Sequence, residues 1–384
     1  MYMLDFQNII SFIKSQFPGE DLIPLHVPVF NGNEKKYLND TIDSTYVSSV
    51  GKYVTRFEEM MCDITGANHA IAIVNGTNAL HIGLILLGVK TNDEVILQPL
   101  TFIATANAIS YIGANHVFVD VDRDTLGMSP KSLKDFLEKY AELGADGFCY
   151  NKSSGRRIKA CVPMHTFGLP CRIDEIEAIC SDYNIELLED AAESIGSYYK
   201  GKHTGVFGKI GIFSFNGNKT VTCGGGGALI TNDAELAKNA KHLTTQAKIH
   251  HPWAFIHDEV GYNYRMPNLN AALACAQLEQ LPSFLENKRA LANIYGSFFV
   301  TINIPFISEL KEARSNYWLN AILLSNLFDR YEFLDFANQN GVMSRPSWEL
   351  MHKLPMFMHS FKTDLSNSEW ISDRLVNIPS SVRL

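Results

Sequence analysis

The chain has 384 residues, of which 46% are hydrophobic, and a formal net charge of −8. This length allows two or three domains around a large buried core, and the acidic balance argues against general nucleic-acid binding, for which a basic face is expected. The sequence contains no run of eighteen apolar residues, so we expect no membrane span. The seven cysteines and twelve histidines have no zinc-like spacing, so we predict reduced cysteines and no metal site.

The beginning of the chain predicts a short helix packed on the body of the protein. Apolar residues recur there at helical spacing: Phe6, Ile9, Ile10, Ile13 and Phe17. Met1 to Phe6 lacks the basic region and the apolar core of a signal peptide, so we expect a cytoplasmic protein.

A phosphate-binding turn is predicted next. A strand from Ala70 to Val74 leads into Gly76-Thr77-Asn78 and then into an apolar helical stretch. Free backbone N–H groups and the positive end of a helix therefore face one point. An ordinary helix cap at Thr77 or Asn78 is the alternative. Further on, Phe102 is a candidate to stack on a cofactor ring, although a core position is the commoner fate of phenylalanine.

Strand and helix signals alternate through this part of the chain. The expected strands are Ala70 to Val74, Glu94 to Leu97, His116 to Val121, Lys159 to Pro163, Ile185 to Glu189 and Ile210 to Phe215. Helical patterns such as Asn78 to Leu87 and Ile173 to Tyr183 separate them. This alternation predicts an α/β fold with a mostly parallel central sheet that helices cover on both faces.

Two chemically important side chains follow strands of this sheet. Asp190 stands at the carboxyl end of a strand, where open α/β sheets bind ligands, and is placed to pair with a protonated ring nitrogen. Lys219 precedes four glycines, Gly224 to Gly227, and is placed to form a Schiff base with a carbonyl. Ser214 offers a hydroxyl donor to the phosphate site. A pyridoxal phosphate enzyme requires these groups together.

His165 also ends a strand on the ligand side of the sheet. Two roles are open for it, one near the cofactor and one as a hydrogen-bonded structural histidine.

Near Val260 the pattern changes to long helices, 269–281 and 284–299, followed by a strand at 318–324. We therefore expect a helical segment over 1–24, a large domain over 25–259 and a smaller C-terminal α+β domain over 260–384. Arg265, Tyr317 and Arg345 offer cationic and aromatic groups for a nucleotide diphosphate, whereas Trp318 is expected in the core.

The motifs occur in an order that resembles the DegT/StrS type of nucleotide-sugar aminotransferase. They are Gly76-Thr77, Thr101 to Ala108, Glu189 to Glu193, Ser214 to Lys219 and Gly261 to Met266. The resemblance spans nearly the whole chain. It implies a fold type I pyridoxal phosphate enzyme that forms a homodimer, with each active site built from both subunits.

The resemblance also implies a role for each matching residue. Lys219 would carry the cofactor and move the proton, and Asp190 would hold the pyridine nitrogen. The cofactor phosphate would be bound by Gly76, Thr77 and Ser214, and by Asn263 of the partner subunit.

The chain departs from the family pattern at two places. Glu193 stands where many relatives have glutamine, and a carboxyl group donates a hydrogen bond only when it is protonated. Either the pKa of Glu193 is raised in an apolar site, or its side chain contacts another group. Gly224 to Gly227 replaces a Gly-Glu-Gly-Gly run, so that the acid is missing.

Within the family, the segment Asn216 to Thr220 with its four glycines resembles enzymes that aminate C4 of a UDP-linked 4-keto-6-deoxy-N-acetylhexosamine. L-glutamate is the usual donor. Enzymes that make GDP-perosamine from a GDP-linked 4-keto-6-deoxymannose share much of the pattern and are the alternative.

Three other functions are compatible with parts of the sequence. A related enzyme that dehydrates C3 of the sugar would carry histidine in place of Lys219. A non-catalytic regulator that binds pyridoxal phosphate would keep the phosphate site but react with no amino acid. A nicotinamide dehydrogenase would need its glycine fingerprint to open a helix, whereas Gly224 to Gly227 leads into the strand-like Ala228-Leu229-Ile230.

Overall fold

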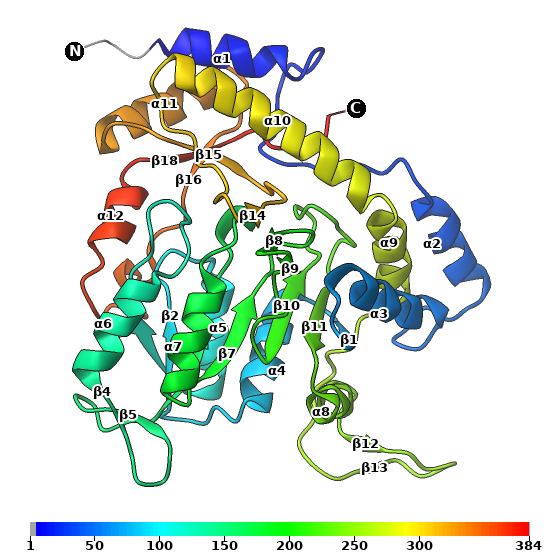
Figure 1. Cartoon of the computed structure of the whole chain (residues 1–384). Coiled ribbons are helices and arrows are strands. Elements are labelled where there is room, and N and C mark those ends of the chain that lie inside the picture. Colours follow the sequence, from blue (N-terminus) through cyan, green and yellow to red (C-terminus); the bar gives the residue numbers. More distant parts are fainter. Residues whose placement is uncertain (1–4, 384) are drawn as a thin grey trace.

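An eight-stranded sheet forms the centre of the protein, whose computed structural model describes residues 5–383 (Figure 1). In spatial order its strands are β1 (His69–Ile73), β11 (Gly227–Thr231), β10 (Ile210–Ser214), β7 (Glu186–Asp190), β6 (Ile158–Val162), β2 (Glu94–Leu97), β3 (Asn115–Phe118) and β17 (Phe361–Lys362). β11 is antiparallel to both of its neighbours, and the pairs from β10 to β17 are parallel. The carboxyl ends of all the strands except β11 therefore lie at one edge.

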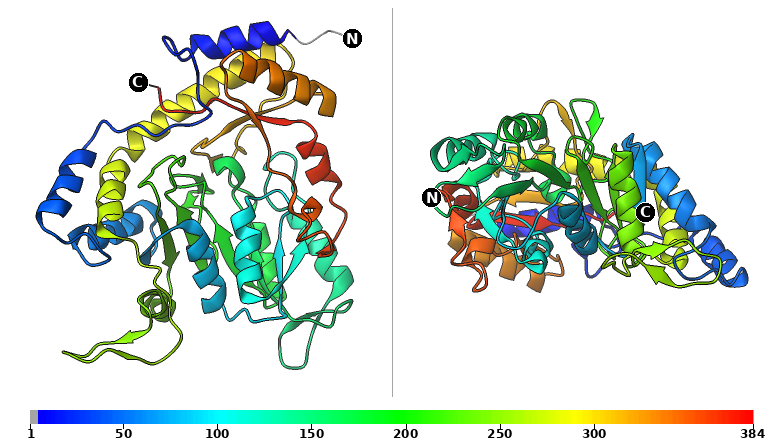
Figure 2. Two further views of the ribbon diagram at one scale, coloured as in Figure 1. Left: turned by 180° about the vertical axis from the view of Figure 1, so that it is seen from behind. Right: turned by 90° about the horizontal axis from the view of Figure 1, so that it is seen from below.

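Helices cover both faces of this sheet, as the sequence predicts (Figure 2). One face packs on α4 (Gly76–Leu86), α5 (Ile103–Ile112) and α8 (Ala234–Thr244). The other packs on α3 (Lys52–Thr65), α6 (Pro130–Tyr140), α7 (Ile173–Asp182) and α9 (Asn268–Leu278). Successive side chains of a strand point to opposite faces, so Ile212 lies in the first core and Phe213 in the second. Both faces need apolar side chains, which explains the continuous apolar runs.

A second body of structure lies above the carboxyl edge of the sheet (Figure 1). It contains α10 (Leu281–Thr301), α11 (Leu327–Gln339) and an antiparallel sheet of β15 (Asn320–Leu323), β18 (Leu375–Ile378) and β16 (Arg345–Pro346). The predicted N-terminal helix is confirmed as α1 (Phe6–Ser15), and its Ile9, Ile10 and Ile13 share a core with Leu291 and Val376. The part of the signal-peptide prediction that concerns Met1 to Leu4 lies outside the described residues.

The remaining elements are short. They are α2 (Glu34–Asp43), α12 (Ser366–Ser372), the 3-10 turns η1 (Thr166–Gly168) and η2 (Met351–Lys353), and the strands β4 (Ala141–Leu143), β5 (Cys149–Asn151), β8 (Tyr198–Tyr199), β9 (Lys202–His203), β12 (Lys248–Ile249), β13 (Ile256–His257) and β14 (Ala313–Arg314). The hairpin of β12 and β13 projects beyond α8 (Figure 1); residues 248–257 are called the arm below. No described helix has both the length and the apolar character that crossing a membrane requires.

Several strands are shorter in the structure than the sequence predicts: β3 ends at Phe118 rather than Val121, and β10 ends at Ser214 rather than Phe215. Residues 318–324 were expected to be extended, but β15 begins only at Asn320. Tyr317 adopts a left-handed conformation with φ 46°, and the N–H of Trp318 binds the Asn316 side chain at 2.8 Å rather than a neighbouring strand. The chain therefore turns just before the strand, which directs Trp318 toward the sheet edge.

Several contacts cross the predicted domain boundaries. α1 packs on α10 and α11, α9 packs against α2 and α3, and β17 joins the central sheet. The division into 1–24, 25–259 and 260–384 stays a prediction.

Candidate active site

A cavity of about 280 Å³ opens at the carboxyl ends of β1, β7 and β10. The predicted residues that line it are Gly76, Thr77, Phe102, Asp190, Glu193, Ser214 and Lys219. Trp318 and Trp348, from the body above the sheet, complete its wall. A larger hollow of about 540 Å³ lies between α3 and α8, but it is away from these residues.

The turn from β1 into α4 forms an anion site. Asn75 caps the helix, because its side-chain oxygen accepts the N–H of Asn78 at 2.8 Å. The expected alternative, a cap at Thr77 or Asn78, is therefore wrong. Gly76 and Thr77 begin α4, where backbone N–H groups have no partner within the helix. Ser214 lies beside them, since a Cβ placed on Gly76 would be 3.0 Å from its Cβ. The free N–H groups of this turn and the Ser214 hydroxyl would together bind a phosphate.

Asp190 is held as a hydrogen-bond acceptor at the end of β7. The hydroxyl of Thr105, on α5, donates to its Oδ2 at 2.7 Å, and the N–H of Ala192 donates to its Oδ1 at 3.2 Å. Burial raises the pKa of Asp190, and these two donors partly oppose that rise. A protonated ring nitrogen bound in the cavity would supply the missing positive charge.

Glu193 and Lys219 form a buried ion pair in which Nζ lies 2.9 Å from Oε1. The second oxygen of Glu193 accepts the N–H of Phe167 at 2.9 Å. Burial raises the pKa of Glu193 to about 7, although Lys219 opposes this shift. Both explanations offered for Glu193 therefore hold, because its pKa is raised and its carboxyl group contacts Lys219.

Trp318 covers the other side of Lys219. The centre of its ring lies 3.7 Å from Nζ, and its indole N–H donates to the carbonyl of Asn218 at 2.7 Å. The expectation that Trp318 lies in the core is confirmed, because the residue is only 4% exposed and packs in a hydrophobic cluster with Phe167 and Leu350. The turn at Tyr317 also brings its ring to the cavity wall. The Lys219 side chain is left only 12% exposed.

Phe102 and Trp348 form an aromatic wall at the cavity mouth. Their ring centres are 6.0 Å apart in an edge-to-face arrangement, a favourable geometry for aromatic pairs. Phe102 is 48% exposed, so its ring has a free surface for a ligand. Its role in stacking on a cofactor stays a prediction.

Four other predicted residues lie elsewhere. Arg265 is buried in an ion pair with Glu58 at 2.8 Å, Tyr317 is buried with its hydroxyl on the N–H of Glu309, and Arg345 donates to Asn338 and Ser344. Asn263 is exposed and does not line the cavity of its own chain. Within this one chain, none of the four faces the cavity.

His165 has a structural environment. Its Nδ1 accepts the N–H of Cys171 at 3.3 Å, and its Nε2 lies 3.0 Å from Glu189. Both ring nitrogens are therefore engaged, which favours the structural role. Among residues 5–383 one group of possible metal ligands occurs, His242, Asp258 and Glu259 near the base of the arm. The absence of a metal site stays a prediction.

The cavity fits a phosphorylated pyridine aldehyde. In such a molecule the phosphate would lie at the turn of Gly76 and Thr77, the ring nitrogen at Asp190 and the aldehyde at Lys219, all of which line the cavity. Pyridoxal phosphate carries these groups on one flat molecule.

Comparison with known proteins agrees with this geometry. The DegT/DnrJ/EryC1/StrS aminotransferase family matches residues 29–384. The chain belongs to this family. It is 37% identical to the GDP-perosamine synthase of Escherichia coli O157:H7 over 358 residues, 93% of each chain. It is 36% identical to that of Vibrio cholerae over 362 residues, 94% of each chain.

Solved structures confirm the fold. The aminotransferase TlmJ from Streptoalloteichus hindustanus superposes with a TM-score of 0.85 at 24% identity, covering 94% of this chain and 93% of that one. This chain therefore has the expected fold type I architecture. Family membership likewise confirms the expected cofactor, pyridoxal phosphate, and the expected class, a nucleotide-sugar transaminase.

Proposed function

We propose that this transaminase moves the amino group of L-glutamate to C4 of a GDP-linked 4-keto-6-deoxymannose and so makes GDP-perosamine. The observation that carries this proposal is the name of the two relatives, GDP-perosamine synthase, at 37% and 36% identity over more than nine tenths of the chain. The UDP-linked N-acetylhexosamine favoured by the segment Asn216 to Thr220 is therefore the second choice.

Lys219 is proposed to carry the cofactor and to move the proton. When bound, pyridoxal phosphate supplies an electron sink for the charge left at a carbon that loses its proton. Nζ of Lys219 takes the proton from the glutamate carbon in the first half-reaction and delivers one to C4 of the sugar in the second. Because both substrates use one cavity in turn, ping-pong kinetics are expected.

Two carboxyl groups support this lysine. Glu193 lies 2.9 Å from Nζ and gives the ammonium a group to which it can release a proton. Asp190, oriented by the hydroxyl of Thr105, provides the negative charge that keeps a ring nitrogen protonated. The backbone at Gly76 and Thr77, with Ser214, anchors the phosphate and fixes the distance between these groups.

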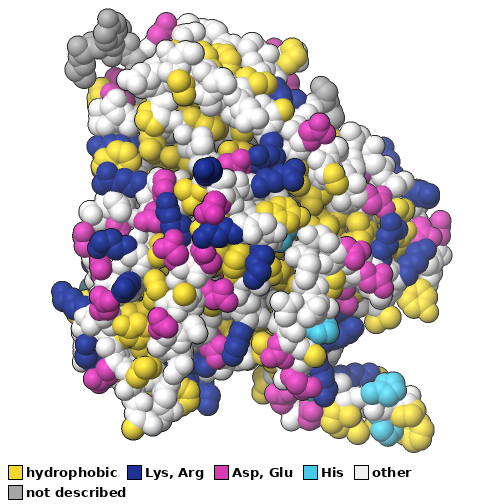
Figure 3. Space-filling view, viewed as in Figure 1, with side chains coloured by type: hydrophobic (Ala, Val, Ile, Leu, Met, Phe, Trp, Pro, Cys, Tyr) yellow, Lys and Arg dark blue, Asp and Glu magenta, His cyan; other side chains and the backbone are white. Residues whose placement is uncertain are grey.

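The active form is proposed to be a homodimer. Asn263 is exposed beside the base of the arm, as expected of a residue that reaches the phosphate of the neighbouring subunit. Trp253 and Phe255 on the arm are 81% and 83% exposed, and large exposed apolar side chains mark contact surfaces. Figure 3 shows the apolar and histidine side chains that gather on the projecting arm.

A direct assay separates the substrates. The purified protein is incubated with pyridoxal phosphate, L-glutamate and either keto sugar, and the product is identified by mass spectrometry. Amination of the GDP sugar is the expected result, and Lys219→Ala, which should lower the rate at least about 10³-fold, gives the background. Preference for the UDP sugar would reverse the substrate assignment, and full turnover by Lys219→Ala would contradict the proposed mechanism.

A further inference from the structure

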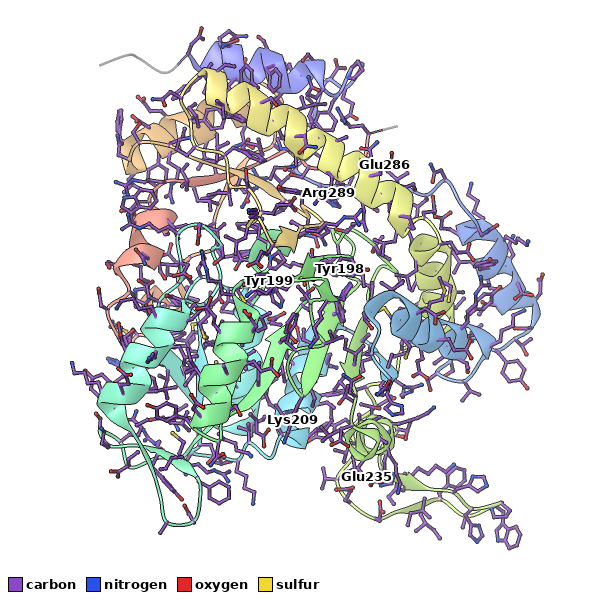
Figure 4. The ribbon with its side chains drawn as sticks, viewed as in Figure 1. Tyr198, Tyr199, Lys209, Glu235, Glu286 and Arg289 are labelled. Atoms are coloured by element: carbon purple, nitrogen blue, oxygen red, sulfur yellow. The ribbon has the colours of Figure 1, made fainter. Side chains whose placement is uncertain are left out.

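Lys288 lies on α10 without an acidic partner. Its side chain is completely buried, and its Nζ donates to the carbonyl oxygens of Trp318, at 3.2 Å, and of Ser380. Among residues 5–383 no carboxylate contributes to the charge environment of this ammonium. Arg289, the next residue on the helix, is labelled in Figure 4. It pairs instead with Glu309 at 2.7 Å.

Stability alone does not explain a lysine at this position. The other buried side chains of α10 nearby include Leu291, Tyr295 and Phe299. A buried ammonium is costly compared with an apolar side chain of similar volume, and burial lowers the pKa of Lys288 to about 7. Methionine would fill the same space without that cost. We therefore relate the ammonium to the two backbone carbonyl groups to which it donates hydrogen bonds.

These carbonyl groups stand at the ends of neighbouring strands. Trp318 precedes β15 and Ser380 follows β18, which pairs with β15. The indole of Trp318 extends from its backbone into the wall of the cavity. There its ring centre lies 3.7 Å from Nζ of Lys219, and its N–H donates to the Asn218 carbonyl. A single residue, Trp318, therefore links the buried ammonium with the reactive lysine.

We propose that Lys288 is a positioning residue for Lys219. Its ammonium holds the Trp318 backbone where the chain leaves the left-handed turn at Tyr317, and this keeps the indole packed against Nζ. The inference rests on the proposed role of Lys219 as the lysine that carries the cofactor.

His26 is the other titratable group that faces this region. Both of its ring nitrogens are buried and have no hydrogen-bond partner among the described residues. Burial, and then the charges of Lys288 and Lys219, hold the pKa of His26 well below its ordinary value. A neutral His26 leaves Lys288 as the group behind Trp318 that can carry a positive charge.

The test measures how accessible Lys219 is in the full-length protein. Lysines of the wild type, of Lys288→Met and of Asn287→Ala are reductively methylated, and labelling of Lys219 is followed by mass spectrometry. Asn287 is the matched control, because it lies on the same helix and donates to the carbonyl of Arg383 at 2.7 Å rather than to that of Trp318. We expect labelling of Lys219 to become about fivefold faster in Lys288→Met, the factor that a cation–π contact supplies, and to stay unchanged in Asn287→Ala.

An unchanged rate in Lys288→Met overturns the proposal, as do equal increases in both variants, which would show a purely structural lysine. If Lys288→Met does not fold, Trp318→Leu tests the same link, and wild-type labelling in that variant also overturns it. A second readout is the pH midpoint of the visible absorption band with pyridoxal phosphate, which should shift in Lys288→Met and not in Asn287→Ala. The labelling requires neither cofactor nor sugar, so its failure is distinguishable from failure of the proposed function.

Discussion

Glu193 shows how one side chain can serve two protonation states. As a carboxylate it accepts hydrogen bonds from Nζ of Lys219 and from the N–H of Phe167. Because burial raises its pKa to about 7, the protonated form is also populated near neutral pH, and that form can donate a hydrogen bond. The carboxyl group can thus act both as a hydrogen-bond donor and as a proton acceptor beside Lys219.

The raised pKa of Glu193 predicts a pH-dependent stability. The folded state holds the proton up to about pH 7, whereas the ordinary pKa is 4.5, so the stabilisation is complete below pH 4.5 and is lost as pH rises to about 7. Relative to Glu193→Gln, the unfolding free energy of the wild type should fall over this range by up to about 3 kcal/mol. Chemical denaturation at pH 5 and pH 8 measures the change, and a constant difference would contradict it.

The hydrogen bond from Thr105 to Asp190 leads to a prediction about cofactor binding. Thr105→Val removes a donor to a buried carboxylate, and hydrogen bonds to charged groups contribute about 1.5–3 kcal/mol. We expect at least about tenfold weaker binding of pyridoxal phosphate, measured by equilibrium titration of the cofactor. Ser110→Ala removes a hydroxyl on the same helix that contacts the Ala106 carbonyl at 3.3 Å and His116 Nε2 at 3.4 Å, away from Asp190. This variant should bind the cofactor normally; equal losses would point to a general effect on α5.

Residues of the site differ in how far the sequence reveals them. Gly76, Asp190 and Lys219 were predictable because each directly follows a strand or a turn with a clear local pattern. The bond between Thr105 and Asp190 joins positions 85 residues apart, so it depends on the packing of α5 against the sheet. The burial of Trp318 was predicted, but its place in the cavity wall was not, because the left-handed turn at Tyr317 has no signal in the apolar pattern around it.

The elements of the central sheet were predictable for a different reason. Buried strands require continuous apolar runs, and β2 matches its predicted bounds, Glu94 to Leu97. Strands such as β16 and β17 contain only two residues each, too few for an alternating pattern. Their pairing partners, far away in the sequence, define them.

Strand β11 packs directly behind the turn of the proposed phosphate site, so its Gly227 has no room for a side chain. A Cβ at Gly227 would lie 2.5 Å from the backbone carbon of Asn75 and 2.9 Å from the nitrogen of Gly76, and backbone atoms cannot move aside as a flexible side chain can. Gly227→Ala should therefore distort the turn and weaken binding of pyridoxal phosphate at least about tenfold. Gly217→Ala is the control for the same titration, since its nearest neighbour would be 3.9 Å away; normal binding by Gly227→Ala would show that the turn adapts.

At the scale of the whole molecule, the arm is the surface that we propose to contact a second subunit. The arm is a two-stranded hairpin that projects from the body (Figure 1), and it carries the exposed Trp253 and Phe255. An isolated hairpin is marginally stable in water. A second subunit would cover these side chains.

Phe255→Glu should therefore convert the proposed dimer into a monomer, because a charge would be buried in an apolar contact. Sedimentation velocity over a range of concentrations measures this. Tyr331→Glu, at a 59% exposed position on α11, is the matched control and should sediment as the wild type does. A wild type that is monomeric at all concentrations would contradict the prediction.

Because β17 lies near the end of the sequence, the sheet edge at β3 is completed only late in synthesis. β3 is complete when residue 118 has emerged, but its neighbour arrives only with residues 361–362. The apolar side of α1 likewise waits for Leu291 and Val376. During synthesis both the sheet edge and this helix are uncovered, and unpaired edges recruit other strands. A chain stopped before residue 361 would retain the cavity residues up to Trp348 and yet leave the β3 edge of the sheet uncovered, so the last residues of the chain protect the sheet rather than build the site.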